Sequence, residues 1–138
     1  MSMSIGDSPV CVAVVICNEV IEDKRTNNKS LIGIFNAVSA PQLPVTHPKM
    51  NVMASITNVT GELAVTLIVR APSGREIMKV DGSIPSSDPL AVIDVLFELL
   101  GVPIEELGTY MVDILSGQSY LGGRRFQVIG QWHQDSNG

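Results

Sequence analysis

Residues 108–129 read Gly-Thr-Tyr-Met-Val-Asp-Ile-Leu-Ser-Gly-Gln-Ser-Tyr-Leu-Gly-Gly-Arg-Arg-Phe-Gln-Val-Ile, and this stretch decides the fold. Two apolar-patterned runs are joined by the short glycine turn 116–118, which is typical of an antiparallel β-hairpin. The first run opens with Gly108 and Tyr110 in Gly-x-Tyr spacing. This spacing is typical of a sandwich strand whose tyrosine hydroxyl bonds back to nearby backbone. We therefore expect Gly108 and Tyr110 to have structural roles.

Five further runs before this hairpin have the composition of strands, and turn clusters separate them. They cover residues 10–21, 30–40, 49–58, 62–70 and 75–84. The first run is almost continuously apolar and β-branched, as in a strand buried on both faces. Alternation in the third and fourth runs predicts one buried face each. With the hairpin and one ambiguous segment, the count is seven or eight strands, which predicts an all-β sandwich.

The segment 89–100 fits both a helix and a strand. Ser-Asp-Pro at 87–89 matches a helix N-cap followed by proline at the first helical position, and apolar residues follow at helical spacing. The same segment also alternates, with Asp94 and Glu98 on one face and apolar residues on the other. Periodicity alone leaves both structures open.

The bulk composition fits one folded domain. A chain of 138 residues is long enough to bury about two-thirds of its unfolded surface, and no internal repeat or charge block divides it. We expect a single β-sandwich domain over 1–138, with frayed ends at about 1–8 and 133–138. Only 17% of residues are charged and the mean hydropathy is positive, which suggests that a partner subunit covers some strand faces.

The net charge and the cysteines indicate which partners and which cellular compartment to expect. A net charge of −5, with only nine Lys and Arg residues, argues against nucleic acid as a partner. The apolar run 9–17 is too short to cross a membrane and lacks the basic flank of a signal peptide. Cys11 and Cys17 lie in one expected strand about 20 Å apart, so they cannot pair with each other, and their even spacing places both on the same face. Two free thiols fit a reducing compartment, so we expect a cytoplasmic protein.

The chain offers few groups for chemistry. His47 lies on an expected proline-rich crossing, where backbone hydrogen bonds are its ordinary partners and a role as general base is the minority interpretation. Arg124 and Arg125 follow a glycine pair, but a phosphate loop should open a helix, whereas a hairpin with a bulge is expected here. The adjacent carboxylates of Glu105 and Glu106 should point apart. We expect no enzyme, no metal and no cofactor, and His47, Arg124 and Arg125 are the candidate binding residues.

Four stretches of the chain carry a resemblance through their order and spacing. They are Cys17-Asn18-Glu19-Val20-Ile21, Lys29-Ser30-Leu31-Ile32-Gly33-Ile34-Phe35, His47-Pro48-Lys49-Met50, and Gly108-Thr109-Tyr110 with the closing hairpin. Together they resemble a family of small bacterial proteins without an assigned function, each built as one immunoglobulin-like β-sandwich. The family pattern has aspartate where this chain has Asn18, so no carboxylate role is expected there.

The resemblance implies an immunoglobulin-like antiparallel β-sandwich of seven to eight strands. Because a strand leads into Gly-x-Tyr in the family, it also implies a strand at 93–99, with a helix at 89–100 as the alternative. It implies no function.

Apolar residues on both faces of several strands favour an interaction module. Met53 lies on the opposite face from Val52, and Ile68 on the opposite face from Val69. Met111 and Leu115 likewise lie on the opposite face from Val112 and Ile114. We expect a non-enzymatic module that binds an unidentified protein partner or its own copy, and neither nucleic acid nor membrane. The alternative is a small-molecule-binding domain, or an undetected enzyme, that uses loops at one end of the sandwich near His47.

Overall fold

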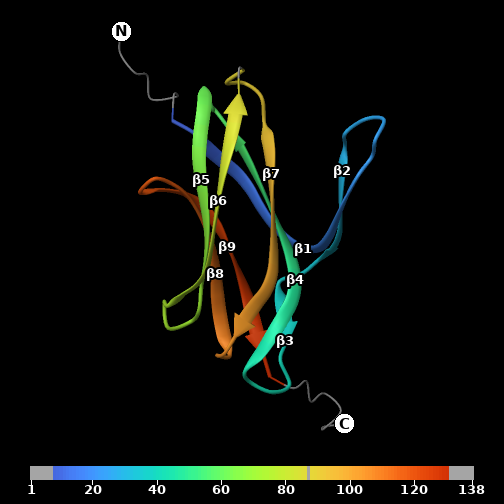
Figure 1. The fold of residues 1–138 in the computed structure, drawn as a ribbon, viewed down its shortest axis with the longest axis vertical. Helices are drawn as coiled ribbons and strands as arrows, with labels where there is room; N and C mark the ends of the chain where they lie inside the picture. The colour runs from blue at the N-terminus through green and yellow to red at the C-terminus, as the bar shows by residue number, and fades with distance from the viewer. Residues whose placement is uncertain (1–7, 87, 131–138) are drawn as a thin grey trace.

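The computed structural model describes residues 8–86 and 88–130. This part of the chain forms nine strands and no helix, arranged as two packed sheets (Figure 1). The strands are β1 (Val10–Glu22), β2 (Lys29–Ile34), β3 (Ala37–Ser39), β4 (Val45–Thr57), β5 (Gly61–Arg70), β6 (Glu76–Ser86), β7 (Ile93–Ile104), β8 (Gly108–Ser116) and β9 (Ser119–Ile129). The predicted all-β sandwich is confirmed, with one strand more than expected. Apart from Ser8, the ends expected to fray lie outside the described residues.

The two sheets have different strand orders. The four-stranded sheet runs β2-β1-β4-β7 with antiparallel neighbours throughout. The five-stranded sheet runs β3-β9-β8-β5-β6, and its pair β3 and β9 is parallel. The closing hairpin is β8 and β9, and their register shifts between Ile114 and Leu115, next to Gly122. The predicted hairpin and its bulge are therefore confirmed.

Alternating side chains of the central strands build the core. The members with no exposed surface include Met50, Val52, Ala54 and Ile56 of β4, Leu67 and Val69 of β5, and Val112 and Ile114 of β8. Aliphatic side chains of this size each contribute about 1.5–3 kcal/mol when they are fully buried. The alternation read from 49–58 and 62–70 thus identifies the inner faces of β4 and β5.

Tyr110 closes a tight corner at the start of β8. Its hydroxyl donates to the carbonyl of Glu106 at 2.8 Å and accepts from the N–H of the same residue at 3.2 Å. The tyrosine is fully buried, and its ring stacks on Phe126 with the centroids 5.2 Å apart. Gly108 has a φ of 126°, and a Cβ there would lie 3.1 Å from the ring of Pro72. Both residues therefore shape the turn that leads into β8.

The ambiguous segment forms a strand. The N-cap signal produces only one turn, in which the N–H of Leu90 donates to the Asp88 carboxylate at 2.9 Å. Thr57 then donates its hydroxyl to the carbonyl of Ala91 at 2.9 Å, which ties this turn to the end of β4. From Ile93 onward the chain pairs with β4, so the strand interpretation is confirmed and the helix is wrong.

Two details of the expected strands are wrong. The run 30–40 is two strands in different sheets, because the chain leaves β2 after Ile34 and bends at Asn36 before β3 begins. His47 lies within β4 and not on a crossing loop. Pro48 fits this strand because β1 pairs with β4 only from Asn51 onward, so β4 has one neighbour at that point.

The first strand also departs from expectation. A bulge between Cys11 and Ala13 inserts one residue and inverts the alternation. Cys11 therefore faces the five-stranded sheet against Gly122, whereas Cys17 pairs with Asn51 and points to the opposite side. The expectation that both thiols share a face is wrong. Both cysteines are free.

The second half of β1 leaves the body of the sandwich. Together with β2 it forms a hairpin that stands away from the other strands (Figure 1). Nearly every residue from Asn18 to Ile34 is exposed or half-buried. The strand expected to be buried on both faces along its length is buried only near its middle, at Val14, Ile16 and Cys17.

Replacement of Tyr110 by Phe should lower the free energy of unfolding by about 1–2 kcal/mol, because two hydrogen bonds to Glu106 are lost in a buried corner. Urea unfolding measures the change. The matched control is Tyr120→Phe, the same chemical change at a residue that is 59% exposed, which should cost less than about 0.5 kcal/mol. Equal effects of the two substitutions would contradict a structural role for the corner.

Candidate functional site

The outer face of the four-stranded sheet carries a row of apolar side chains. Val15, Met53 and Leu96 lie directly opposite one another on β1, β4 and β7, and none of them points into the core. We call the outward set the apolar face; it comprises Val10, Val15, Met53, Leu96 and Leu100. Val10 is 45% exposed, Leu96 40% and Leu100 62%. These strands therefore present apolar surface on both of their faces.

Carboxylates accompany the apolar face. The Lys49 ammonium lies 3.7 Å from the carboxylate of Glu19 and 3.6 Å from that of Glu98, so one cation serves two anions. Asp94 accepts a hydrogen bond of 2.6 Å from the hydroxyl of Ser55. Three carboxylates against one ammonium leave this surface negative.

The outer face of the five-stranded sheet has a different character. Polar pairs cover it, among them Arg70 with Asp113 at 3.1 Å and Thr66 with Asp81 at 2.7 Å. Three apolar residues also face outward here, but Ile68 is only 8% exposed and Met111 and Leu115 are half-buried. Among the described strands, the strongly exposed large aliphatic side chains lie on the four-stranded sheet.

His47 borders a hollow between the two sheets. The hollow has a volume of about 300 Å³ and is lined by Asn18, Phe35, Ala37, Val38, Ser39 and His47. The rings of Phe35 and His47 lie 6.0 Å apart. Partial burial lowers the pKa of His47, so the imidazole is neutral near pH 7. No charged side chain is among the lining residues.

The thiols are not activated as nucleophiles. Burial raises the pKa of the Cys17 thiol, which donates a hydrogen bond of 3.4 Å to the carbonyl of Glu19. The same cause raises the pKa of Cys11. A reactive cysteine needs a lowered pKa, which a neighbouring cation or a helix N-terminus provides.

The structure separates Arg124 from Arg125. Arg124 points inward, where it donates to the carbonyl of Val14 at 3.1 Å and to the side-chain oxygen of Asn36 at 2.8 Å. Arg125 lies on the other face of β9, opposite Met111. The pair therefore does not form one anion site, and Arg124 joins β9 to β1.

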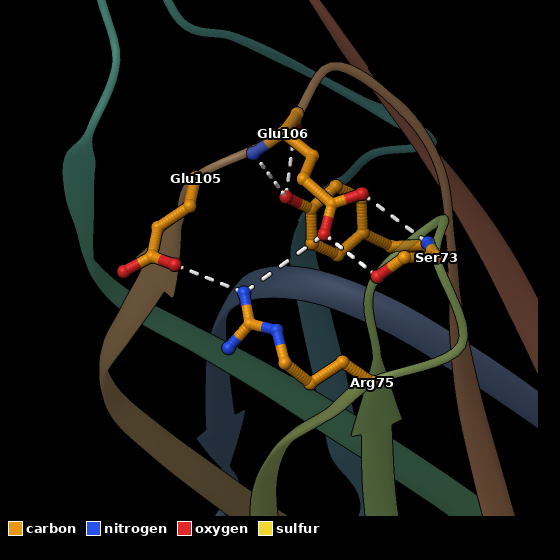
Figure 2. Close-up of polar contacts among 5 residues, drawn as sticks. Ser73, Arg75, Glu105 and Glu106 are labelled. Carbon is orange, nitrogen blue, oxygen red and sulfur yellow. Dashed lines mark hydrogen bonds and ion pairs between the residues drawn. The ribbon is translucent and has the colours of Figure 1, made fainter.

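Glu105 and Glu106 belong to a polar cluster at the end of the sandwich (Figure 2). Arg75 lies 2.9 Å from the Glu105 carboxylate and 3.8 Å from that of Glu106. The Glu106 carboxylate also accepts from the hydroxyl of Ser73 at 2.9 Å and from its N–H at 3.2 Å. Each carboxylate is thus engaged in holding the β5–β6 turn against the β7–β8 turn.

The described residues contain neither a cluster of metal ligands nor a membrane-spanning helix. No group of three or more His, Cys, Asp or Glu side chains within 8–86 and 88–130 could hold a metal ion. No helix in this part of the chain is long and apolar enough to cross a membrane.

Two packed sheets, a closing hairpin and a tyrosine corner define an immunoglobulin-like β-sandwich. A family model described as a family of unknown function, DUF6941, matches residues 12–129, and the chain belongs to this family. The resemblance inferred from the sequence, to small domains without an assigned function, is thereby confirmed. Comparison with curated proteins found no match.

Two solved structures are similar in fold. An immunoglobulin-like protein from Pseudomonas aeruginosa is 16% identical, with 91% of this chain and 99% of that chain covered and a TM-score of 0.46. A β-glucosidase from Listeria innocua in complex with isofagomine is 15% identical, with 69% of this chain covered and a TM-score of 0.47. The chain spans only 15% of the length of that enzyme.

Lowering the pH from 7.5 to 5.5 should destabilise the protein partly through His47. Its pKa is about 6.5 in an unfolded chain and lower in the folded one, so the unfolded chain binds the proton first and is favoured as the pH falls. Urea midpoints at the two pH values measure this loss. His47→Gln, which does not titrate, should lose less stability over the same interval. An equal loss in the variant would contradict the burial of this imidazole.

Proposed function

We propose that this chain is a non-enzymatic interaction module that binds another protein through the apolar face. The observation that carries the proposal is the row Val15, Met53 and Leu96 in the middle of a sheet whose other face already forms the core. Exposed apolar side chains scattered singly are normal on a protein, but a contiguous set marks a binding surface.

The size of the apolar face supports this function. The three strands β1, β4 and β7, about 4.8 Å apart over some eight residues at about 3.3 Å each, span about 380 Å² of sheet, which the apolar side chains share with Asp94, Glu98 and Lys49. Patches of about 300–600 Å² are the largest on most monomers and are often functional. The outer face of the five-stranded sheet allows a comparison within the same chain. Polar pairs such as Arg70 with Asp113 lie on that face, whereas exposed Leu96 and Leu100 lie on the outer face of the four-stranded sheet.

The projecting hairpin enlarges this surface. Ile34 pairs with Cys17 and Ile32 pairs with Glu19, which places both isoleucines on the outward side. Ile34 is 55% exposed and Ile32 46%. Because a two-stranded hairpin alone is marginally stable in water, a bound partner would stabilise it.

The two free thiols fit a reducing compartment, so we propose that the module works in the cytoplasm.

The hollow beside His47 supports a second candidate function, the binding of a small neutral molecule. It offers the Asn18 amide, the Ser39 hydroxyl and a neutral imidazole next to the ring of Phe35. A thermal-shift screen of neutral metabolites tests this candidate. Stabilisation that disappears in His47→Ala and persists in Tyr120→Phe would favour it over the interaction module.

A photo-crosslinking amino acid at position 96 should capture a discrete partner in the native cell, whereas the same group at position 107 should not. Leu107 is the matched control, because it is exposed to a similar degree, at 50%, and lies on the β7–β8 turn. With the captured partner purified, Leu96→Glu should weaken binding at least tenfold, and Leu107→Glu should leave it unchanged.

A hydrophobic dye provides an independent check. Its fluorescence with the purified protein should fall in Leu96→Glu and be retained in Leu107→Glu. Equal capture at both positions, together with no dye binding, would overturn the proposed function. If position 96 crosslinks to a second copy of the chain and light scattering shows a dimer, the partner is the chain itself and not another protein.

A further inference from the structure

The four-stranded sheet ends in an open edge. β7 pairs with β4 along its length, and no strand of the described residues pairs with its other side. In immunoglobulin constant-type sandwiches the corresponding sheet has the order A-B-E-D. Here β1, β4 and β7 occupy the places of A, B and E, and the chain enters β7 directly after β6. The position of strand D is therefore the position beside β7.

The edge of β7 is protected by few of the usual devices. Natural proteins blunt exposed edges with proline, a bulge or charged side chains, lysine above all, and the charged side chains of β7 are the carboxylates Asp94 and Glu98. From Ile93 to Leu100 the strand contains neither proline nor lysine, and its register with β4 is unbroken. β6, the long edge strand of the other sheet, carries both Lys79 and Pro85. Of the two long edges, β7 is the one open to pairing.

The core-facing side of the sandwich is incompletely covered at the edges of β6 and β7. The edges of β6 and β7 meet where Gly82 lies against the ring of Phe97. Ile93 and Val95 of β7 pack on the core but are only half-buried, as are Met78 and Val80 of β6. A strand beside β7 would cover apolar side chains on its inner side and extend the apolar face on its outer side.

Charge indicates what kind of strand fits. The outward residues of β7 alternate Asp94, Leu96, Glu98 and Leu100. Glu98 shares Lys49 with Glu19, and no cation of the described residues pairs with Asp94. Opposite charges across strands stabilise a sheet and like charges destabilise it. An antiparallel second copy of β7 would bring its own Asp94 and Glu98 opposite or diagonal to these carboxylates, which disfavours self-pairing.

We propose that β7 binds an extended segment of another protein by strand addition, with Lys or Arg opposite Asp94 and Glu98 and apolar residues opposite Leu96 and Leu100. This inference rests on the proposed function and names its partner chemistry. Main-chain hydrogen bonds to β7 provide affinity, and the alternating outward side chains provide specificity. A basic residue every fourth position, with an apolar residue midway between, is the pattern expected in the partner.

A synthetic peptide tests the proposal. The probe is Lys-Thr-Val-Thr-Lys-Thr-Val-Thr-Lys, whose repeat fits β7 in either direction. We expect it to bind the full chain, to slow amide hydrogen exchange in 93–100, and to weaken as salt rises. A scrambled peptide of the same composition should bind at least tenfold more weakly. A peptide N-methylated at every residue after the first, which has no N–H to donate along either edge, should also lose at least tenfold in affinity.

Substitutions in β7 test whether Asp94 and Glu98 recognise the lysines of the probe. Asp94→Lys with Glu98→Lys should weaken the probe about tenfold and favour a peptide with Glu in place of Lys. The milder pair Asp94→Asn with Glu98→Gln, which retains hydrogen-bond acceptors, should have an intermediate effect. The matched control places the same two charge reversals on β6, as Glu76→Lys with Asp81→Lys, and should leave the affinity unchanged.

The outcomes separate this inference from the proposed function. Equal binding of the N-methylated and unmodified peptides would overturn strand addition, while position 96 would still crosslink to a partner. Failure of every peptide to protect 93–100 would overturn the inference as well. Protection of 93–100 without peptide, accompanied by a dimer, would show a second copy on this edge and would also overturn it. Loss of crosslinking at position 96 would remove the proposed function itself.

Discussion

The whole structure depends on one constraint, which is that a β-sheet has two faces and a sandwich covers only the inner one of each sheet. In the five-stranded sheet the chain meets this constraint with polar pairs outside, such as Arg70 with Asp113. In the four-stranded sheet it places Leu96 and Met53 outside although Val52 and Phe97 already fill the inside. Stability needs only the inner layer, so the outer apolar residues call for an explanation beyond the fold of this chain.

Sequence reasoning recovered the parts of the fold that local patterns determine. The closing hairpin follows from two apolar runs about a glycine turn, and the inner face of β4 follows from the alternation between Met50 and Ile56. The pattern around 89–100 is truly ambiguous, because the N-cap signal at Asp88 does produce a turn. Pairing with β4 decides against the helix, and such long-range contacts cannot be read from a local pattern.

The error at the two cysteines has a physical cause, because a single inserted residue changes the parity of everything beyond it. The bulge after Cys11 puts the two thiols on opposite sides, and no residue type at that point indicates it. Arg124 and Arg125 lie on two faces for a simpler reason, since successive residues of a regular strand point to opposite sides. The apolar face was partly visible in the sequence, since Met53 was recognised as facing away from Val52. The extension of this face over β1 and β7 follows only from the register of the strand pairs, which local patterns do not determine.

The parallel pairing of β3 with β9 has a consequence for biosynthesis. β9 is the last of the described strands to leave the ribosome, so β3 and the edge that it forms wait for a strand about eighty residues further along before they can dock. β4 likewise has to wait for β7, some forty residues later, before its second neighbour exists. During that interval the apolar strands are open on a nascent chain. A chaperone, or a partner made at the same time, would then act on the protein before it is complete.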